Sequence, residues 1–94
     1  MYNRKNMINE FCFVSVEFVD DPNVVGAKYW YESDDTSVRV GDIVSAPLGR
    51  HNNLQNGVVR EVRFCTEYDM PYPIELVKNI KYIVKRSKDV QNNR

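Results

Sequence analysis

Hydrophobic and polar residues alternate with a period of two near the start of the chain. In residues 11–19 every second side chain is apolar, and the intervening positions change from apolar at Phe11 to polar at Glu17. Successive side chains of a β-strand point to opposite faces, so this pattern predicts a strand that packs mainly on one side. The predicted core face carries Cys12, Val14, Val16 and Phe18.

A second strand is predicted over residues 27–33, after a turn formed by the polar residues 20–23. Tyr29 and Tyr31 share one face of this strand, and Trp30 lies on the other. We expect the two tyrosines to pack inward, and in that case Trp30 projects away from the core.

A Gly-Asp turn then precedes a strand–loop–strand unit. Residues 43–46 are strand formers and predict a third strand. Pro47 has no N–H to donate, so we expect it to end the pairing, and Gly49 can adopt a positive φ that turns the chain. Residues 50–56 follow as a polar loop, and residues 57–64 predict a fourth strand because β-branched and charged residues alternate there.

The last third of the chain has two readings. In the first, a loop rich in Tyr and Pro at residues 66–73 leads into a short helix near residues 73–79, and residues 80–84 form a last strand. In the second, a single helix covers residues 74–86, because the apolar residues there also fit a period of 3.6.

Short strands separated by turn signals predict an all-β (or β-rich α+β) fold. We expect a small antiparallel β-barrel of about five to six strands with one short helix. The chain has 94 residues, of which 43% are hydrophobic, as in one small globular domain. The expected organisation is a barrel domain over residues 11–85, with flexible tails at 1–10 and 86–94.

Charge is balanced over the whole chain and uneven along it. There are 13 acidic and 13 basic residues, so bulk charge gives no argument for a nucleic-acid partner. Residues 1–42 carry eight acidic and four basic side chains, whereas residues 43–94 carry five and nine. This asymmetry fits either a basic face for an anionic partner or an ordinary solvated surface.

Location and cofactors follow from what the sequence lacks. The first ten residues have no apolar signal-peptide core, and no apolar run approaches the ~20 residues of a membrane span. We therefore expect a cytoplasmic protein without a membrane partner, in which Cys12 and Cys65 are free thiols. These two cysteines and one histidine lack metal-ligand spacing, so we expect no metal and no other cofactor.

Candidate catalytic groups are sparse. The one histidine, His51, lies in the polar loop, and a general base needs a nucleophile and an orienting group beside it. The paired acids of the turns serve local hydrogen bonding in most proteins. No Gly-rich phosphate loop is present, so we expect a protein that is not an enzyme.

Candidate binding groups are easier to find. An outward Trp30 offers a ring for base stacking, worth roughly 1–3 kcal/mol per base, unless residues 68–72 or the N-terminal tail cover it. The polar loop adds Arg50, whose guanidinium suits a phosphate, and Asn53, unless it is an ordinary hydrophilic hairpin. A basic track is expected if the barrel also gathers Arg60, Arg63, Lys78 and Lys81.

Two segments of the chain resemble a known family. Residues 40–50, VGDIVSAPLGR, followed by GVV at 57–59, are similar to a pattern of the N-terminal DNA-binding domain of the primosomal helicase PriA. That pattern is a Gly-containing turn, a hydrophobic strand, Pro-Phe-Gly, a polar loop and Gly-(Ile/Val)-Val. Residues 75–80, ELVKNI, are similar to the Leu-Lys segment before the family's last strand. The likeness covers residues 14–84.

The resemblance implies a barrel that captures the 3′ end of a DNA strand. In the family the end is held by an aromatic-Asp-Tyr segment, the glycine of Pro-Phe-Gly and a lysine near the end of the domain. The segment corresponds here to residues 29–31, with Trp30 in place of the aspartate that reads the free 3′ terminus. The glycine corresponds to Gly49, after Leu48 in place of Phe, and the lysine to Lys78. We expect a stand-alone copy of this domain, accessory to DNA replication or restart.

Two functions from different classes follow. The first is a nucleic-acid-binding module for single-stranded DNA or strand ends, with the site residues Tyr29, Trp30, Tyr31, Gly49, Arg50, Asn53 and Lys78. The alternative is a protein–protein interaction module on the same barrel. It predicts an open edge strand or an apolar patch of Trp30, Tyr68, Met70 and Tyr72, and no binding of nucleic acid.

Overall fold

The computed structural model describes residues 10–66, 68–70 and 73–87. These residues form six strands and one short 3-10 helix, η1. In chain order the elements are β2 (Glu10–Glu17), β3 (Lys28–Glu32), β4 (Ile43–Leu48), β5 (Asn53–Thr66), η1 (Ile74–Leu76), β6 (Lys78–Asn79) and β7 (Tyr82–Lys85).

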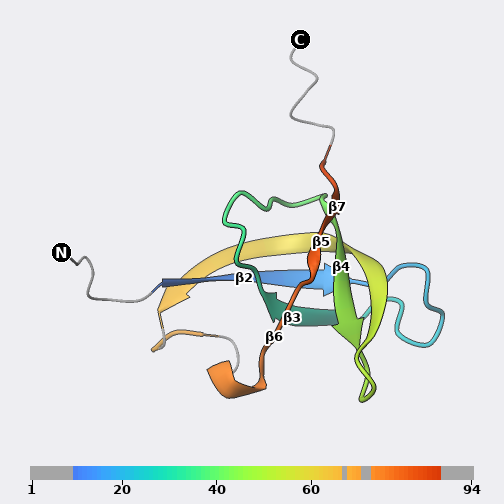
Figure 1. Ribbon diagram of the computed structural model, residues 1–94, viewed down its shortest axis with the longest axis horizontal. Helices are drawn as coiled ribbons and strands as arrows, with labels where there is room; N and C mark the ends of the chain where they lie inside the picture. The colour runs from blue at the N-terminus through green and yellow to red at the C-terminus, as the bar shows by residue number, and fades with distance from the viewer. Residues whose placement is uncertain (1–9, 67, 71–72, 88–94) are drawn as a thin grey trace, which may run out of the picture.

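The six strands belong to one sheet that curls into a half-barrel (Figure 1). Their order is β6-β3-β2-β5-β4-β7, and every pair is antiparallel except β3 and β6, which are parallel. The prediction of a small, all-β, barrel-like domain is thus confirmed. The sheet is mixed because of the β3–β6 pair.

Strand β5 holds the two halves of the sheet together. Its first part pairs with β4 from Asn53 to Val58, and its second part pairs with β2 from Val58 to Thr66. The strand bends near the change of partner, where the β2 register shifts by a bulge. At this bend Gly57 allows close approach, because a Cβ there would lie 2.4 Å from Cγ1 of Val16.

The concave side of the sheet carries the core, and the predicted faces of the first two strands are confirmed. Tyr29 and Tyr31 pack inward, with ring centroids 6.0 and 6.2 Å from that of Phe18. Trp30 lies on the opposite face, where it pairs with Ser15. The buried core cluster consists of Cys12, Val14, Val16, Phe18, Tyr31, Val38, Val44, Ala46 and Val59.

The segment with β6 and β7 crosses the open side of the curved sheet (Figure 1). β6 pairs with β3, whereas β7 pairs with β4 at the other edge. Between them, the N–H of Ile80 donates to the carbonyl of Glu32 at 3.0 Å, and the N–H of Lys81 donates to that of Ser45 at 2.7 Å. The short helix and final strand are confirmed, and a single helix over 74–86 is wrong. The apolar residues with a 3.6 period are divided between η1, the connections on either side of β6, and β7.

Two expectations about the β4–β5 hairpin are wrong. Pro47 does not end the pairing, because β4 continues to Leu48 and Pro47 pairs with Leu54. β7 pairs with β4 only as far as Ser45, so Pro47 lies where that edge of β4 is open and a missing N–H is tolerated. The polar loop is also shorter than predicted. It comprises residues 49–52, and Asn53 already begins β5.

A buried carboxylate ties the end of the described chain to the start of β4. Asp42 is 0% exposed, and its two oxygens accept the N–H groups of Arg39 at 3.0 Å and Ser87 at 2.7 Å. A guanidinium nitrogen of Arg86 lies 3.5 Å from the same carboxylate. We call these four residues the Asp42 clasp. Two of its residues, Arg86 and Ser87, belong to the segment 86–94 that was expected as a tail.

Candidate nucleic-acid interface

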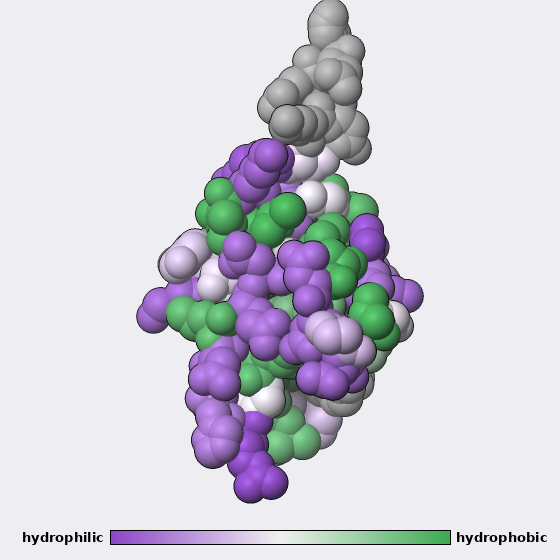
Figure 2. Space-filling view, turned by 90° about the vertical axis from the view of Figure 1, so that its right-hand side faces the viewer, coloured by the Kyte–Doolittle hydropathy of each residue, from purple (hydrophilic) through white to green (hydrophobic). Residues whose placement is uncertain are grey.

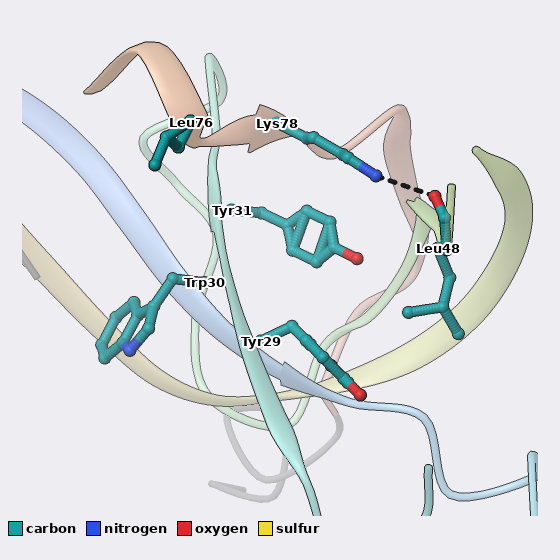
Figure 3. Close-up of a pocket in the computed structure, with 7 residues that line it drawn as sticks. Tyr29, Trp30, Tyr31, Leu48, Leu76 and Lys78 are labelled. Atoms are coloured by element: carbon teal, nitrogen blue, oxygen red, sulfur yellow. Dashed lines mark hydrogen bonds between the residues drawn. The ribbon is translucent and has the colours of Figure 1, made fainter. Parts of the chain in front are cut away.

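A pocket of about 290 Å³ opens at the rim of the half-barrel, beside the β4–β5 turn (Figure 3). Ligand pockets typically start near 300 Å³, so this one fits a single small unit rather than a large ligand. Its walls come from β3, from the end of β4 and from the segment that crosses the open side. The lining residues are Tyr29, Trp30, Tyr31, Leu48, Gly49, Leu76 and Lys78.

Two tyrosines of β3 point to the pocket side of the strand (Figure 3). Tyr31 is 3% exposed, and its hydroxyl donates a hydrogen bond to the carbonyl of Pro47 at 2.6 Å. This bond fixes β3 to the end of β4 beneath the pocket. Burial, together with the nearby Tyr29, raises the pKa of Tyr31 to about 12. Tyr29 is only half-buried, so it is the aromatic wall that a ligand can reach.

Lys78 spans the pocket mouth. Its Nζ donates to the carbonyl of Gly49 at 3.0 Å, which links β6 to the β4–β5 turn (Figure 3). An ammonium group has three donors, so Lys78 keeps donor capacity for an anionic ligand. Gly49 has φ +79°, and a Cβ added there would meet no atom within 4 Å. The glycine is therefore required by backbone conformation, and the space beside it stays open.

The ring of Trp30 points away from the two tyrosines (Figure 3). The guanidinium carbon of Arg63 lies 5.1 Å from the ring centroid, in cation–π contact. Arg63 also donates to Glu61 at 2.8 Å. Trp30 therefore borders the pocket, but its indole faces the outer side of the sheet. The tail at 1–9 and residues 71–72, expected as alternative covers, lie outside the described residues.

The other predicted residues lie outside this pocket. Arg50 is exposed in the β4–β5 turn, and Asn53 is exposed at the start of β5. Neither lines the pocket. The basic side chains that could extend a track beside Arg50 are divided among different places: Lys78 lines the pocket, Arg63 contacts the Trp30 ring, and Arg60 pairs with Glu17 at 2.9 Å.

Sequence reasoning did not name the two leucines of the pocket as site residues. Leu48 stands where the family has the phenylalanine of Pro-Phe-Gly, and its place next to Gly49 could have indicated that it lines the site. Leu76 is 70% exposed and lines the pocket. Its position within the ELVKNI segment gave no indication that it would stand opposite β3.

Among the residues that the structure describes, no three metal-ligating side chains cluster, and no helix is long and apolar enough to cross a membrane. No family model, curated protein or solved structure matches the chain.

Proposed function

We propose that the chain binds nucleic acid, as single-stranded DNA or DNA strand ends, through the pocket beside Lys78. The observation that carries this proposal is a convergence of residues. All the positions that correspond to the strand-end site of the PriA domain, residues 29–31, Gly49 and Lys78, line one pocket. They come from three separate stretches of sequence, and a pattern match that arose by chance would not be expected to gather them.

The chemistry of the walls fits one nucleotide. The side chains of Leu48 and Leu76 and the ring of Tyr29 offer apolar surface to a base, which every nucleobase can use through its flat faces. Lys78 supplies a positive charge at the mouth for a phosphate. With Trp30 in the acidic position of the family, recognition of a free terminal hydroxyl by a carboxylate is absent, so stacking and charge supply the affinity.

The test compares two lysines. A fluorescently labelled single-stranded oligonucleotide is titrated with the protein at low salt, and anisotropy gives the affinity. Lys78→Ala removes a charged hydrogen-bond donor and is expected to weaken binding about 10-fold, equivalent to about 1.4 kcal/mol. Lys85→Ala is the control, because Lys85 is also exposed but lies away from the pocket. No binding by the wild type, or equal losses in both variants, contradicts the proposal.

Exposed apolar side chains favour the protein-interaction alternative. Tyr68 is 87% exposed and Leu76 70% exposed. The predicted patch included Tyr72, which lies outside the described residues. Figure 2 shows one face of the molecule, on which hydrophobic residues form separate patches among hydrophilic ones. Under this alternative, light scattering detects self-association that Leu76→Ser abolishes, and oligonucleotides do not bind at any salt concentration.

A further inference from the structure

Two more hollows continue from the pocket along the segment that joins β6 to β7. The first, of about 570 Å³, shares Lys78 with the pocket and also contacts Lys81. The next, of about 230 Å³, shares Lys81 and Asp34 with it and reaches Tyr82. Neighbouring hollows share lining residues, so the three lie one after another along this segment, and we call them together the track.

The backbone of this track is fixed at both sides. The Ile80 N–H bonds to Glu32 of β3 at 3.0 Å, and the Lys81 N–H bonds to Ser45 of β4 at 2.7 Å. Lys78 and Lys81 are therefore held at defined places by a main chain that is bonded to two strands. A ligand along the track does not need to order a mobile loop, which lowers the entropic cost of binding.

Charge favours an anionic occupant in the middle hollow, whereas the far hollow is lined by Asp34 and Asp35 against Lys81. The middle hollow is lined by two lysines, Lys78 and Lys81, against one acid, Asp34. Lys81 is exposed, and the structure shows no carboxylate within ion-pairing distance of its ammonium group among the described residues. At the far end, the side chain of Tyr82 is 56% exposed and offers a second aromatic surface.

We propose that the track carries the strand that leaves the pocket. Its backbone phosphate lies between Lys78 and Lys81, and a second base stacks on Tyr82. This inference rests on the proposed function, because it needs a nucleotide in the pocket. Four residues of extended chain separate Lys78 from Tyr82, a span of roughly 13 Å at about 3.3 Å per residue. That length exceeds one nucleotide, so the site takes a short oligonucleotide rather than a mononucleotide.

The experiment measures affinity against length. A mononucleotide and labelled single-stranded oligonucleotides of increasing length are titrated at two or more salt concentrations. Wild-type affinity is expected to rise about 10-fold or more beyond the mononucleotide and then to level off. Lys81→Ala is expected to lose most of this gain and to lower the slope of log K against log salt by about 0.7. Its affinity for the mononucleotide stays unchanged, because Lys81 does not line the pocket.

Two other variants sharpen the assignment. Asp34→Asn removes the acid beside the phosphate path and is expected to strengthen oligonucleotide binding a few-fold without affecting the mononucleotide. Tyr82→Ala removes the ring on which the second base stacks. The affinity should therefore level off at a shorter oligonucleotide than with the wild type. Lys85→Ala, an exposed lysine on the same β7 strand that lines none of the three hollows, serves as the control.

The outcomes separate this inference from the proposed function. Binding of the mononucleotide with no gain at greater length overturns the track and leaves the pocket intact. The track is also overturned if Lys81→Ala keeps the gain in affinity with oligonucleotide length and the wild-type slope of log K against log salt. Competition by an acidic peptide that matches or exceeds competition by the oligonucleotide assigns the lysines to a protein partner. Absence of binding at any length overturns both proposals.

Discussion

The two ends of strand β4 use polar groups in opposite ways. At the Ile43 end, the carboxylate of Asp42 is fully buried and accepts two backbone N–H groups, with Arg86 beside it. At the Leu48 end, Lys78 is exposed, and its ammonium group donates a hydrogen bond to a neutral carbonyl, that of Gly49. At the Ile43 end the polar groups bond to one another, whereas at the Leu48 end a charge and apolar surface remain accessible to a ligand.

The difference shows where stability and binding are located. Substitution of a buried, multiply bonded carboxylate is expected to lower stability, because its partly buried N–H partners lose their acceptor. An exposed ammonium on a carbonyl contributes little to folding, because water satisfies both groups when the contact is lost. We therefore expect substitutions at the Ile43 end to change stability and substitutions at the Leu48 end to change binding.

The largest effect is expected from Asp42→Asn. The amide replaces one acceptor oxygen by a donor, so either the Arg39 or the Ser87 N–H loses its partner and faces an NH₂ group. The free energy of unfolding, measured by urea denaturation, should fall by about 2–4 kcal/mol. Asp20→Asn, at an exposed turn residue, is the matched control and should change it by less than about 0.5 kcal/mol. If the two substitutions lower the free energy of unfolding equally, the Asp42 clasp adds no more stability than an exposed carboxylate does.

A smaller, pH-dependent effect is expected at Tyr31. Its pKa of about 12 in the folded protein lies above the ordinary value of 10.0, so the folded state holds the phenol proton more tightly than the unfolded state does. The stabilisation is complete below pH 10 and is lost as the pH rises from 10 to 12. The loss should be on the order of 2–3 kcal/mol.

Tyr31→Phe isolates this effect, because it removes the ionisable group and the bond to Pro47 together. At pH 8 the variant should be less stable than the wild type by about 1 kcal/mol, the usual net value of one hydrogen bond. Near pH 12 the wild type should be the less stable of the two. Its Tyr31 ionises more readily in the unfolded state, which favours unfolding, and the variant has no such group. Parallel stability curves for the two proteins across pH 8–12 would contradict the assignment.

Local periodicity made the strands and their faces predictable. Alternation placed Val14 and Phe18 in the core, and Tyr31 opposite Trp30, because backbone geometry alone fixes which neighbours share a face. The strand at residues 53–56 was not predicted, because these residues are mostly polar and show no alternation. They form a strand by pairing with β4. Burial of Asp42 was also missed, since its partner Ser87 is 45 residues away.

Five of the seven residues that line the pocket were expected from the sequence, whereas Leu48, Leu76 and the geometry of the site were not. Gly49 and Lys78 are 29 residues apart, and only the resemblance to a known pattern placed them together. The direction of the Trp30 ring followed from the strand period, yet its contact with Arg63 depends on how β2 lies between β3 and β5. Long-range pairing of this kind has no signal in a single sequence.

The smallest effect, and the most direct test of the contrast, compares two exposed cations. Arg86→Ala removes the ion pairs with Asp42 and Asp35 but leaves both N–H donors on Asp42, so the loss of stability should be below about 1 kcal/mol. Its oligonucleotide affinity should be unchanged. Lys78→Ala should show the converse, with unchanged stability and weakened binding. If one variant changes both quantities, the two ends of β4 are energetically coupled, and the separation of folding from binding does not hold.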